Sequence, residues 1–66
     1  MKINYNNTAV DVPNNSSLQA FLAGLGCDRI GVAAALNEQV VARSDWAKTI
    51  LSEGDALIVI EIAQGG

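Results

Sequence analysis

Hydrophobic and polar residues alternate along the first dozen positions of the chain. In residues 1–5 the odd positions are Met, Ile and Tyr and the even ones are polar, the period-two pattern of a half-buried strand. The alternation resumes in residues 8–12 after Asn6 and Asn7, and asparagine tolerates the left-handed backbone of a tight turn. This stretch therefore predicts a β-hairpin that ends at Pro13.

The spacing then changes from strand-like to helical. Ser16 and Gln19 are three residues apart, as in a capping box, and predict the start of a helix. The apolar residues that follow lie at i, i+3, i+4 and i+7, and they are Leu18, Phe21, Leu22 and Leu25. Gly26 is placed to end the helix in a left-handed conformation, which gives a short helix of about nine residues that depends on packing for its stability.

Two short apolar segments follow a connector at residues 27–31. Residues 32–36 and 39–41 predict a second hairpin, with Asn37 and Glu38 as its turn. Beyond it, Ser44 is placed to cap a short helical turn over residues 45–47. We expect Trp46, the single indole of the chain, to be a lid at the edge of the core. Residues 52–55 form a polar turn before the last strand.

The last strand is the most apolar part of the chain, with four aliphatic residues in succession at positions 57–60. Such a run suits a buried strand at the centre of a sheet. Alternation places Ile58, Ile60 and Ile62 on one face, and Leu57, Val59 and Glu61 on the other. The charge of Glu61 suggests that its face is open, so Leu57 and Val59 are predicted to form an exposed patch that, with Glu61, binds a partner. The alternative is that neighbouring side chains cover both residues.

The order of elements predicts an α+β fold. Since the first and last strands both carry bulky apolar residues, the economical arrangement pairs them in parallel at the centre of a mixed sheet, with the helix crossing one face. This is the β-grasp architecture of ubiquitin. We expect residues 1–62 to form the domain and residues 63–66 to be a flexible tail, whose two terminal glycines make a slim thread or are simply a frayed end.

Length and cysteine content bear on the number of domains and on the cellular location. The chain has 66 residues, enough for one small domain, and half of them are apolar. A single cysteine excludes an internal disulfide, which favours a reducing, cytoplasmic location. No apolar run approaches the ~20 residues that cross a bilayer, and the first residues lack the apolar region of a signal peptide, so no membrane association is expected.

Charge and residue types narrow the functional classes further. Seven acidic and four basic side chains give a net charge of −3, and the basic residues are scattered, so nucleic acid is not an expected partner. The chain has no histidine, and one cysteine cannot build a zinc site. Cys27 follows a predicted helix C-terminus, which disfavours a thiolate. We therefore expect neither a bound metal nor an active site, and hence a protein that is not an enzyme.

Specific motifs in the second half of the chain resemble the ThiS family of sulfur carriers in thiamin biosynthesis. They are the spacing Asn-x-x-x-Val-x-Arg-x-x-Trp within residues 36–46, then Leu51-x-x-Gly54-Asp55, then Gly65-Gly66. One departure is Ala42, where the family often has proline, a change in the loop that touches no chemistry. Length and element order agree throughout.

This resemblance implies a carrier whose terminal carboxylate, on Gly66, becomes a thiocarboxylate, while Gly65 allows the tail to pass through a narrow channel. A ThiF-like adenylating enzyme would activate Gly66 with ATP, a cysteine desulfurase or related protein would provide sulfur, and a ThiG-like thiazole synthase would receive it. The chain itself would bind no cofactor. Alternatives are a molybdopterin-type sulfur carrier, a ubiquitin-like modifier joined to a lysine, and an interaction module without covalent chemistry.

Overall fold

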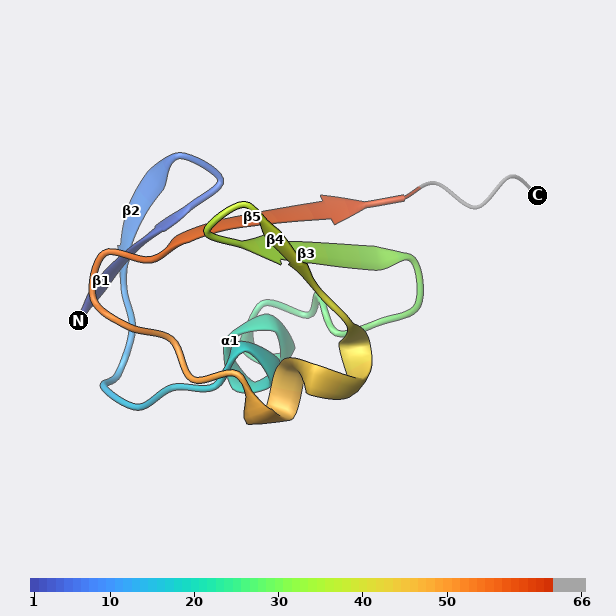
Figure 1. Cartoon of the computed structure of the whole chain (residues 1–66), viewed down its shortest axis with the longest axis horizontal. Helices are drawn as coiled ribbons and strands as arrows, with labels where there is room; N and C mark the ends of the chain where they lie inside the picture. The colour runs from blue at the N-terminus through green and yellow to red at the C-terminus, as the bar shows by residue number, and fades with distance from the viewer. Residues whose placement is uncertain (63–66) are drawn as a thin grey trace.

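The computed structural model of the chain describes residues 1–62 (Figure 1). The predicted tail at residues 63–66, which includes Gly65 and Gly66, lies outside the described residues. The elements in chain order are β1 (Lys2–Tyr5), β2 (Thr8–Asp11), α1 (Leu18–Gly24), β3 (Val32–Leu36), β4 (Gln39–Val41), the 3-10 helix η1 (Arg43–Lys48) and β5 (Ala56–Glu61).

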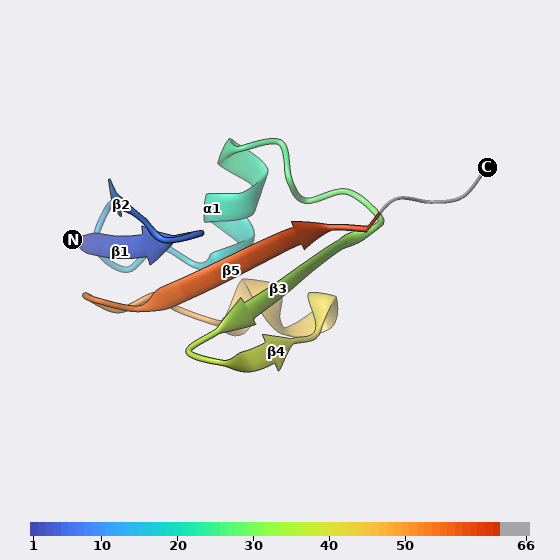
Figure 2. The same cartoon turned by 90° about the horizontal axis from the view of Figure 1, so that it is seen from above.

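The strands form one mixed sheet in the order β2-β1-β5-β3-β4. β1 and β5 are parallel, whereas the other neighbouring strands are antiparallel. Figure 2 shows β5 running through the middle of the sheet, and Figure 1 shows α1 and η1 together on one side of it. This is the β-grasp fold, as predicted from the order of the elements.

Both hairpins turn through two residues in the left-handed region of the backbone. Asn6 and Asn7 have φ angles of 48° and 68°, and Asn37 and Glu38 have φ angles of 50° and 72°. Two positive φ angles in succession match the right-handed twist of the strands that the turn connects. The predicted turns are therefore confirmed at the predicted residues.

The start of α1 differs by one residue from the prediction. Ser17 is the N-cap of α1, because its hydroxyl oxygen accepts a hydrogen bond of 3.0 Å from the backbone N–H of Ala20. The Ser16 hydroxyl instead donates to the carbonyl of Pro13 at 2.5 Å. A capping box between Ser16 and Gln19 was thus wrong, since two adjacent serines offer two possible starts and the loop geometry selects the second.

The C-terminus of α1 follows the sequence prediction. The helix has seven residues, fewer than expected, and Gly26 lies just beyond it with a φ angle of 73°. The N–H of Gly26 donates to the carbonyl of Ala23 at 3.1 Å, and the N–H of Cys27 donates to that of Leu22 at 2.8 Å. This pair of bonds is a Schellman motif, which satisfies helix-end carbonyls that α1 itself leaves unpaired.

The core lies between the sheet and the two helices. Its buried residues are Ile3, Val12, Leu18, Leu22, Ala34, Trp46, Leu51 and Leu57. Trp46 is only 1% exposed, so it is part of this core rather than a lid at its edge. Its indole N–H donates to the carbonyl of Val41 at 2.9 Å, which satisfies the polar atom of a buried ring. η1 begins after Ala42 without a side-chain cap, so the cap expected from Ser44 was wrong.

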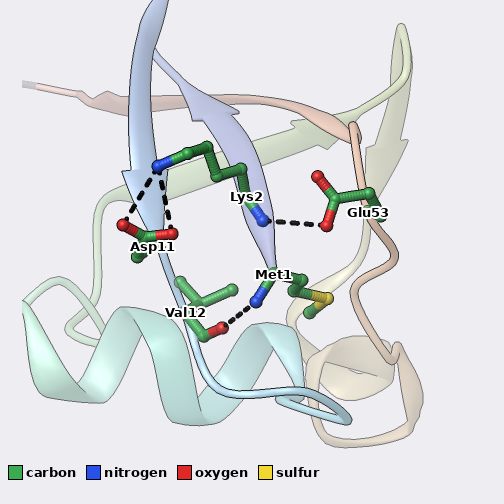
Figure 3. Close-up of polar contacts among 5 residues, drawn as sticks. All are labelled: Met1, Lys2, Asp11, Val12 and Glu53. Atoms are coloured by element: carbon green, nitrogen blue, oxygen red, sulfur yellow. Dashed lines mark hydrogen bonds and ion pairs between the residues drawn. The ribbon is translucent and has the colours of Figure 1, made fainter.

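The N-terminal residues tie β1 to its surroundings (Figure 3). The α-amino group of Met1 donates to the carbonyl of Val12 at 2.8 Å. The ammonium of Lys2 reaches both carboxylate oxygens of Asp11 at 3.2 and 3.1 Å, and the backbone N–H of Lys2 donates to Glu53 at 3.1 Å. The Lys2–Asp11 pair is well exposed and adds little stability. The bonds of Met1 and of the Lys2 N–H hold β1 against the residue that follows β2 and against the turn that precedes β5.

The assignment of faces on β5 was reversed. Leu57 is fully buried in the core and Val59 packs against it, whereas Ile58 and Ile60 are 39% and 57% exposed. Leu57 and Val59 therefore form no exposed patch, and their predicted role in partner binding is not supported. Glu61 is exposed although it alternates onto the core side, because it lies at the end of the strand and pairs with Arg29 at 2.5 Å. A charged residue at a strand end does not identify the open face.

The corrected faces predict opposite consequences for two substitutions of similar size. Leu57→Ala should lower the free energy of unfolding by about 2–5 kcal/mol, because it leaves a cavity in the core. Ile60→Ala, on the exposed face of the same strand, should change it by less than about 1 kcal/mol. Urea denaturation followed by circular dichroism measures both, and equal losses in the two variants would contradict the burial pattern.

Candidate docking face and carrier terminus

The sheet surface opposite α1 carries a group of exposed apolar side chains. Across the strands, Val40 is paired with Ala35, which is paired with Ile58, and Ala33 is paired with Ile60. Val40 is 81% exposed, and Ile62, which continues the alternation of β5, is 55% exposed. We call Val40, Ala33, Ala35, Ile58, Ile60 and Ile62 the open-face patch.

The shape of the open-face patch follows from the small residues of β3. Ala33 and Ala35 rise little above the backbone, so the isoleucines of β5 stand beside a low surface on which another molecule can approach closely. No helix covers this side of the sheet in the described part of the chain (Figure 1). Contiguous exposed apolar surface of this kind is typical of protein interaction sites.

The beginning of β5 is held by a side-chain network between two loops. The amide of Asn37 donates to Asp55 at 3.1 Å and accepts from the backbone N–H of Ala56 at 3.0 Å. The other carboxylate oxygen of Asp55 accepts from the N–H of Ser52 at 2.7 Å. The Asn and Gly-Asp positions of the sequence motif therefore have a structural role, which is to fix where β5 starts.

The middle of β5 is held by Asn6, at the point where β1 has already ended. The side-chain oxygen of Asn6 accepts from the N–H of Val59 at 2.8 Å, and its amide nitrogen donates to the carbonyl of Val59 at 3.2 Å. The backbone N–H of Asn6 also donates to Leu57 at 2.8 Å. The side chain thus replaces the next peptide group of β1 and extends the parallel ladder while the backbone turns away.

The end of β5 contacts the connector between α1 and β3. The N–H of Ile62 donates to the carbonyl of Gly31 at 2.6 Å, and Glu61 pairs with Arg29. β5 is therefore held at its start, middle and end by three separate loops. These contacts fix the position of Ile62, which is the last described residue before the segment that ends in Gly66.

The sequence-predicted site residues fall into three groups. Gly65 and Gly66 lie outside the described residues. Leu57 and Val59 face the core, and Glu61 lies at the sheet edge in an ion pair. The open-face patch was missed, because a run of four aliphatic residues has no polar position to show which face is solvated. Val40 is the most exposed member of the open-face patch, and only the strand register shows that it shares a face with Ile58.

The described residues offer no cluster of metal ligands. Within residues 1–62, no three or more His, Cys, Asp or Glu side chains gather closely enough to hold a metal ion. Cys27 is half-buried beside the end of α1. Over the same residues, no helix is both long and apolar enough to pass through a membrane.

Comparison with known proteins identifies the family. The model of the ThiS family matches residues 3–66, nearly the whole chain. The chain belongs to the ThiS family. It is also 30% identical over 66 residues to the sulfur carrier protein ThiS of Escherichia coli K12, with both chains covered in full. This membership confirms the resemblance predicted from the motifs, and it makes the chain a carrier protein rather than an enzyme.

Solved structures agree with this assignment at the level of the fold. A crystal structure of the thiamine biosynthesis protein ThiS from Geobacter metallireducens superposes with a TM-score of 0.85 at 23% identity, covering both chains in full. An NMR solution structure of a thiamine biosynthesis protein from the same organism gives a TM-score of 0.80 at 25% identity. It covers all of this chain and 88% of the other.

The bonds of Asn6 to Val59 predict a measurable loss of stability on their removal. Asn6→Gly keeps the positive φ angle accessible and removes both side-chain bonds, so the free energy of unfolding should fall by about 1–2 kcal/mol. Asn7→Gly is the matched control, because Asn7 also has a positive φ angle and its side chain makes no hydrogen bond within residues 1–62. Urea denaturation that shows equal losses would contradict the role given to Asn6.

Proposed function

We propose that this chain carries sulfur for thiazole formation in thiamin biosynthesis, as a thiocarboxylate on Gly66. The observation that carries the proposal is the family match, which runs through residue 66 and so includes the Gly65-Gly66 end. The curated relative of the same length, itself named a sulfur carrier protein, supports it. Gly65 has the role of passage, because a residue without a Cβ atom fits a narrow channel.

The chemistry assigns catalysis to partners. A carboxylate is a poor electrophile, so a ThiF-like enzyme joins one Gly66 carboxylate oxygen to the α-phosphorus of ATP, and pyrophosphate leaves. Sulfur from a persulfide, such as that of a cysteine desulfurase, then attacks the acyl carbon and AMP leaves with the oxygen. A reductant thiol of the donor system releases the thiocarboxylate from the resulting acyl disulfide. A ThiG-like thiazole synthase is the proposed acceptor, and the chain needs no cofactor of its own.

The open-face patch is the proposed docking surface for the adenylating enzyme. Gly66 is four residues beyond Ile62, and four residues span at most about 14 Å when fully extended. An enzyme that reacts with Gly66 therefore has to bind close to Ile62. Ile58, Ile60 and Ile62 lie on the strand that leads to this segment and are all exposed. Burial of this apolar surface would contribute affinity next to the reacting carboxylate. A cytoplasmic location belongs to the same proposal, because the lone thiol suits a reducing compartment.

Intact mass spectrometry tests the chemistry directly. After incubation with ATP, magnesium, a ThiF-like enzyme and a persulfide donor, the C-terminal peptide should gain the mass difference between sulfur and oxygen. The control is a chain lacking Gly66, which should melt at the same temperature and stay unmodified. Attachment to a lysine of another protein would indicate a modifier instead. No mass change, while an established carrier in the same mixture is converted, would overturn the proposal.

Substitutions on the open-face patch test the docking surface. Ile58→Ser with Ile60→Ser should raise the KM of the adenylating enzyme for the carrier at least about tenfold, because interface anchors each contribute ~1 kcal/mol or more. Ile50→Ser is the matched control, since Ile50 is 52% exposed but lies on the bridge to Ser17, away from the patch. An unchanged KM in the double variant, measured by ATP–pyrophosphate exchange, would exclude this surface as the docking site.

A further inference from the structure

Arg43 joins two parts of the chain that the fold otherwise leaves separate. One of its guanidinium nitrogens donates to the carbonyl of Asp28 at 2.7 Å, and the other donates to the carbonyl of Arg29. The same guanidinium lies 4.6 Å from the centre of the Trp46 ring. Arg43 thus connects η1 to residues 28–31 of the connector between α1 and β3.

The Trp46 ring, against which the Arg43 guanidinium stacks, is held rigidly. Trp46 is buried in the core and its indole N–H is bonded to Val41, so the ring has a fixed position. A guanidinium held over an aromatic ring is stabilised by the ring quadrupole, and its planar fork allows it to donate to two carbonyl oxygens at once. A lysine ammonium in the same place is a point charge that cannot keep both bonds and the stacking together.

The connector in turn contacts the end of the central strand. Gly31 accepts the N–H of Ile62 at 2.6 Å, and Arg29 pairs with Glu61. The Arg29–Glu61 pair is well exposed on both sides, so it adds little by itself. The backbone bond to Ile62 continues the β3–β5 ladder, in which Val32 pairs with Glu61. The two carbonyl bonds of Arg43 hold the part of the connector that leads into it, at Asp28 and Arg29.

We infer that Arg43 is a positioning residue for the carrier terminus: through the connector, it fixes Ile62 and hence the direction in which the chain leaves the sheet. This inference rests on the proposed function, in which an enzyme receives the segment after Ile62. A terminus whose starting point is already ordered loses less freedom on binding, and this ordering lowers the cost of association. The inference gives Arg43 no chemical part in the reaction.

Hydrogen exchange of the free protein tests the positioning role without any enzyme. In Arg43→Lys, the Ile62 amide should exchange about tenfold faster than in the parent protein, because the loss of charge-assisted bonds favours local opening. The amide of Leu57, near the start of the same strand, should be unchanged. Arg29→Lys is the matched control, since it makes the same replacement but keeps a cation opposite Glu61. The exchange rate of its Ile62 amide should be close to that of the parent protein.

Kinetics with the adenylating enzyme test the consequence for the reaction. Arg43→Lys should raise the KM for the carrier about fivefold and leave kcat within about twofold of the parent value. The reason is that the entropic cost of ordering the chain beyond Ile62 falls on the binding step. Arg43→Gln should behave in the same way, with Lys48→Gln as a control for the loss of one positive charge from η1.

Each contrary result has a separate meaning. Unchanged exchange at Ile62 in Arg43→Lys would overturn the inference, as would faster exchange at Ile62 and Leu57 alike, because Arg43 would then support the fold in general. Faster exchange at Ile62 alone with an unchanged KM would overturn its role in the reaction. A parent chain that the enzyme does not adenylate would overturn the proposed function itself, a failure that the enzyme-free exchange experiment distinguishes from a failure of the positioning role.

Discussion

The hydrogen bonding of β5 on both of its edges is the constraint on which the rest of the structure depends. Toward β1, the carbonyls of Asp55 and Leu57 each accept a backbone N–H at 2.8 Å. Toward β3, Ala56 accepts the N–H of Asn37 at 2.8 Å and Ile62 donates to Gly31. With its two edges occupied, the strand cannot rotate about its axis, so the direction of every side chain on it is fixed. One face contributes Leu57 to the core, and the other presents the isoleucines to solvent.

A few side-chain contacts explain how so small a domain keeps this strand in place. β1 ends at Tyr5 and β3 ends at Leu36, and side-chain amides continue their pairing with β5, Asn6 beyond β1 and Asn37 beyond β3. Trp46 fills the core and positions Arg43. The motif residues Asn37, Arg43 and Trp46 therefore make structural contacts, which suits a protein whose chemistry is done by partners.

The two faces of the sheet have different physical tasks. Apolar burial against α1 and η1 stabilises the fold, whereas the open-face patch has exposed side chains that the fold does not need. Substitutions on the second face can therefore change association with little effect on stability, because few core contacts are lost. The loops that contact β5 at its start, middle and end have a task of their own. They fix the point on the sheet, at Ile62, from which the chain continues.

Local sequence determined the order of the elements, both hairpin turns and the glycine stop after α1, because turn chemistry and periodicity act over a few residues. The parallel pairing of the first and last strands followed instead from the bulky apolar residues that both carry. The motifs were also enough to identify the family. Tertiary structure decided which face of β5 is buried, since a run of four aliphatic residues fits either face equally well. It also decided that Trp46 lies inside the core, that Ser17 rather than Ser16 caps α1, and that Asn6 and Arg43 reach Val59 and the connector. These outcomes depend on contacts between residues distant in the sequence, where packing selects among local alternatives of similar energy.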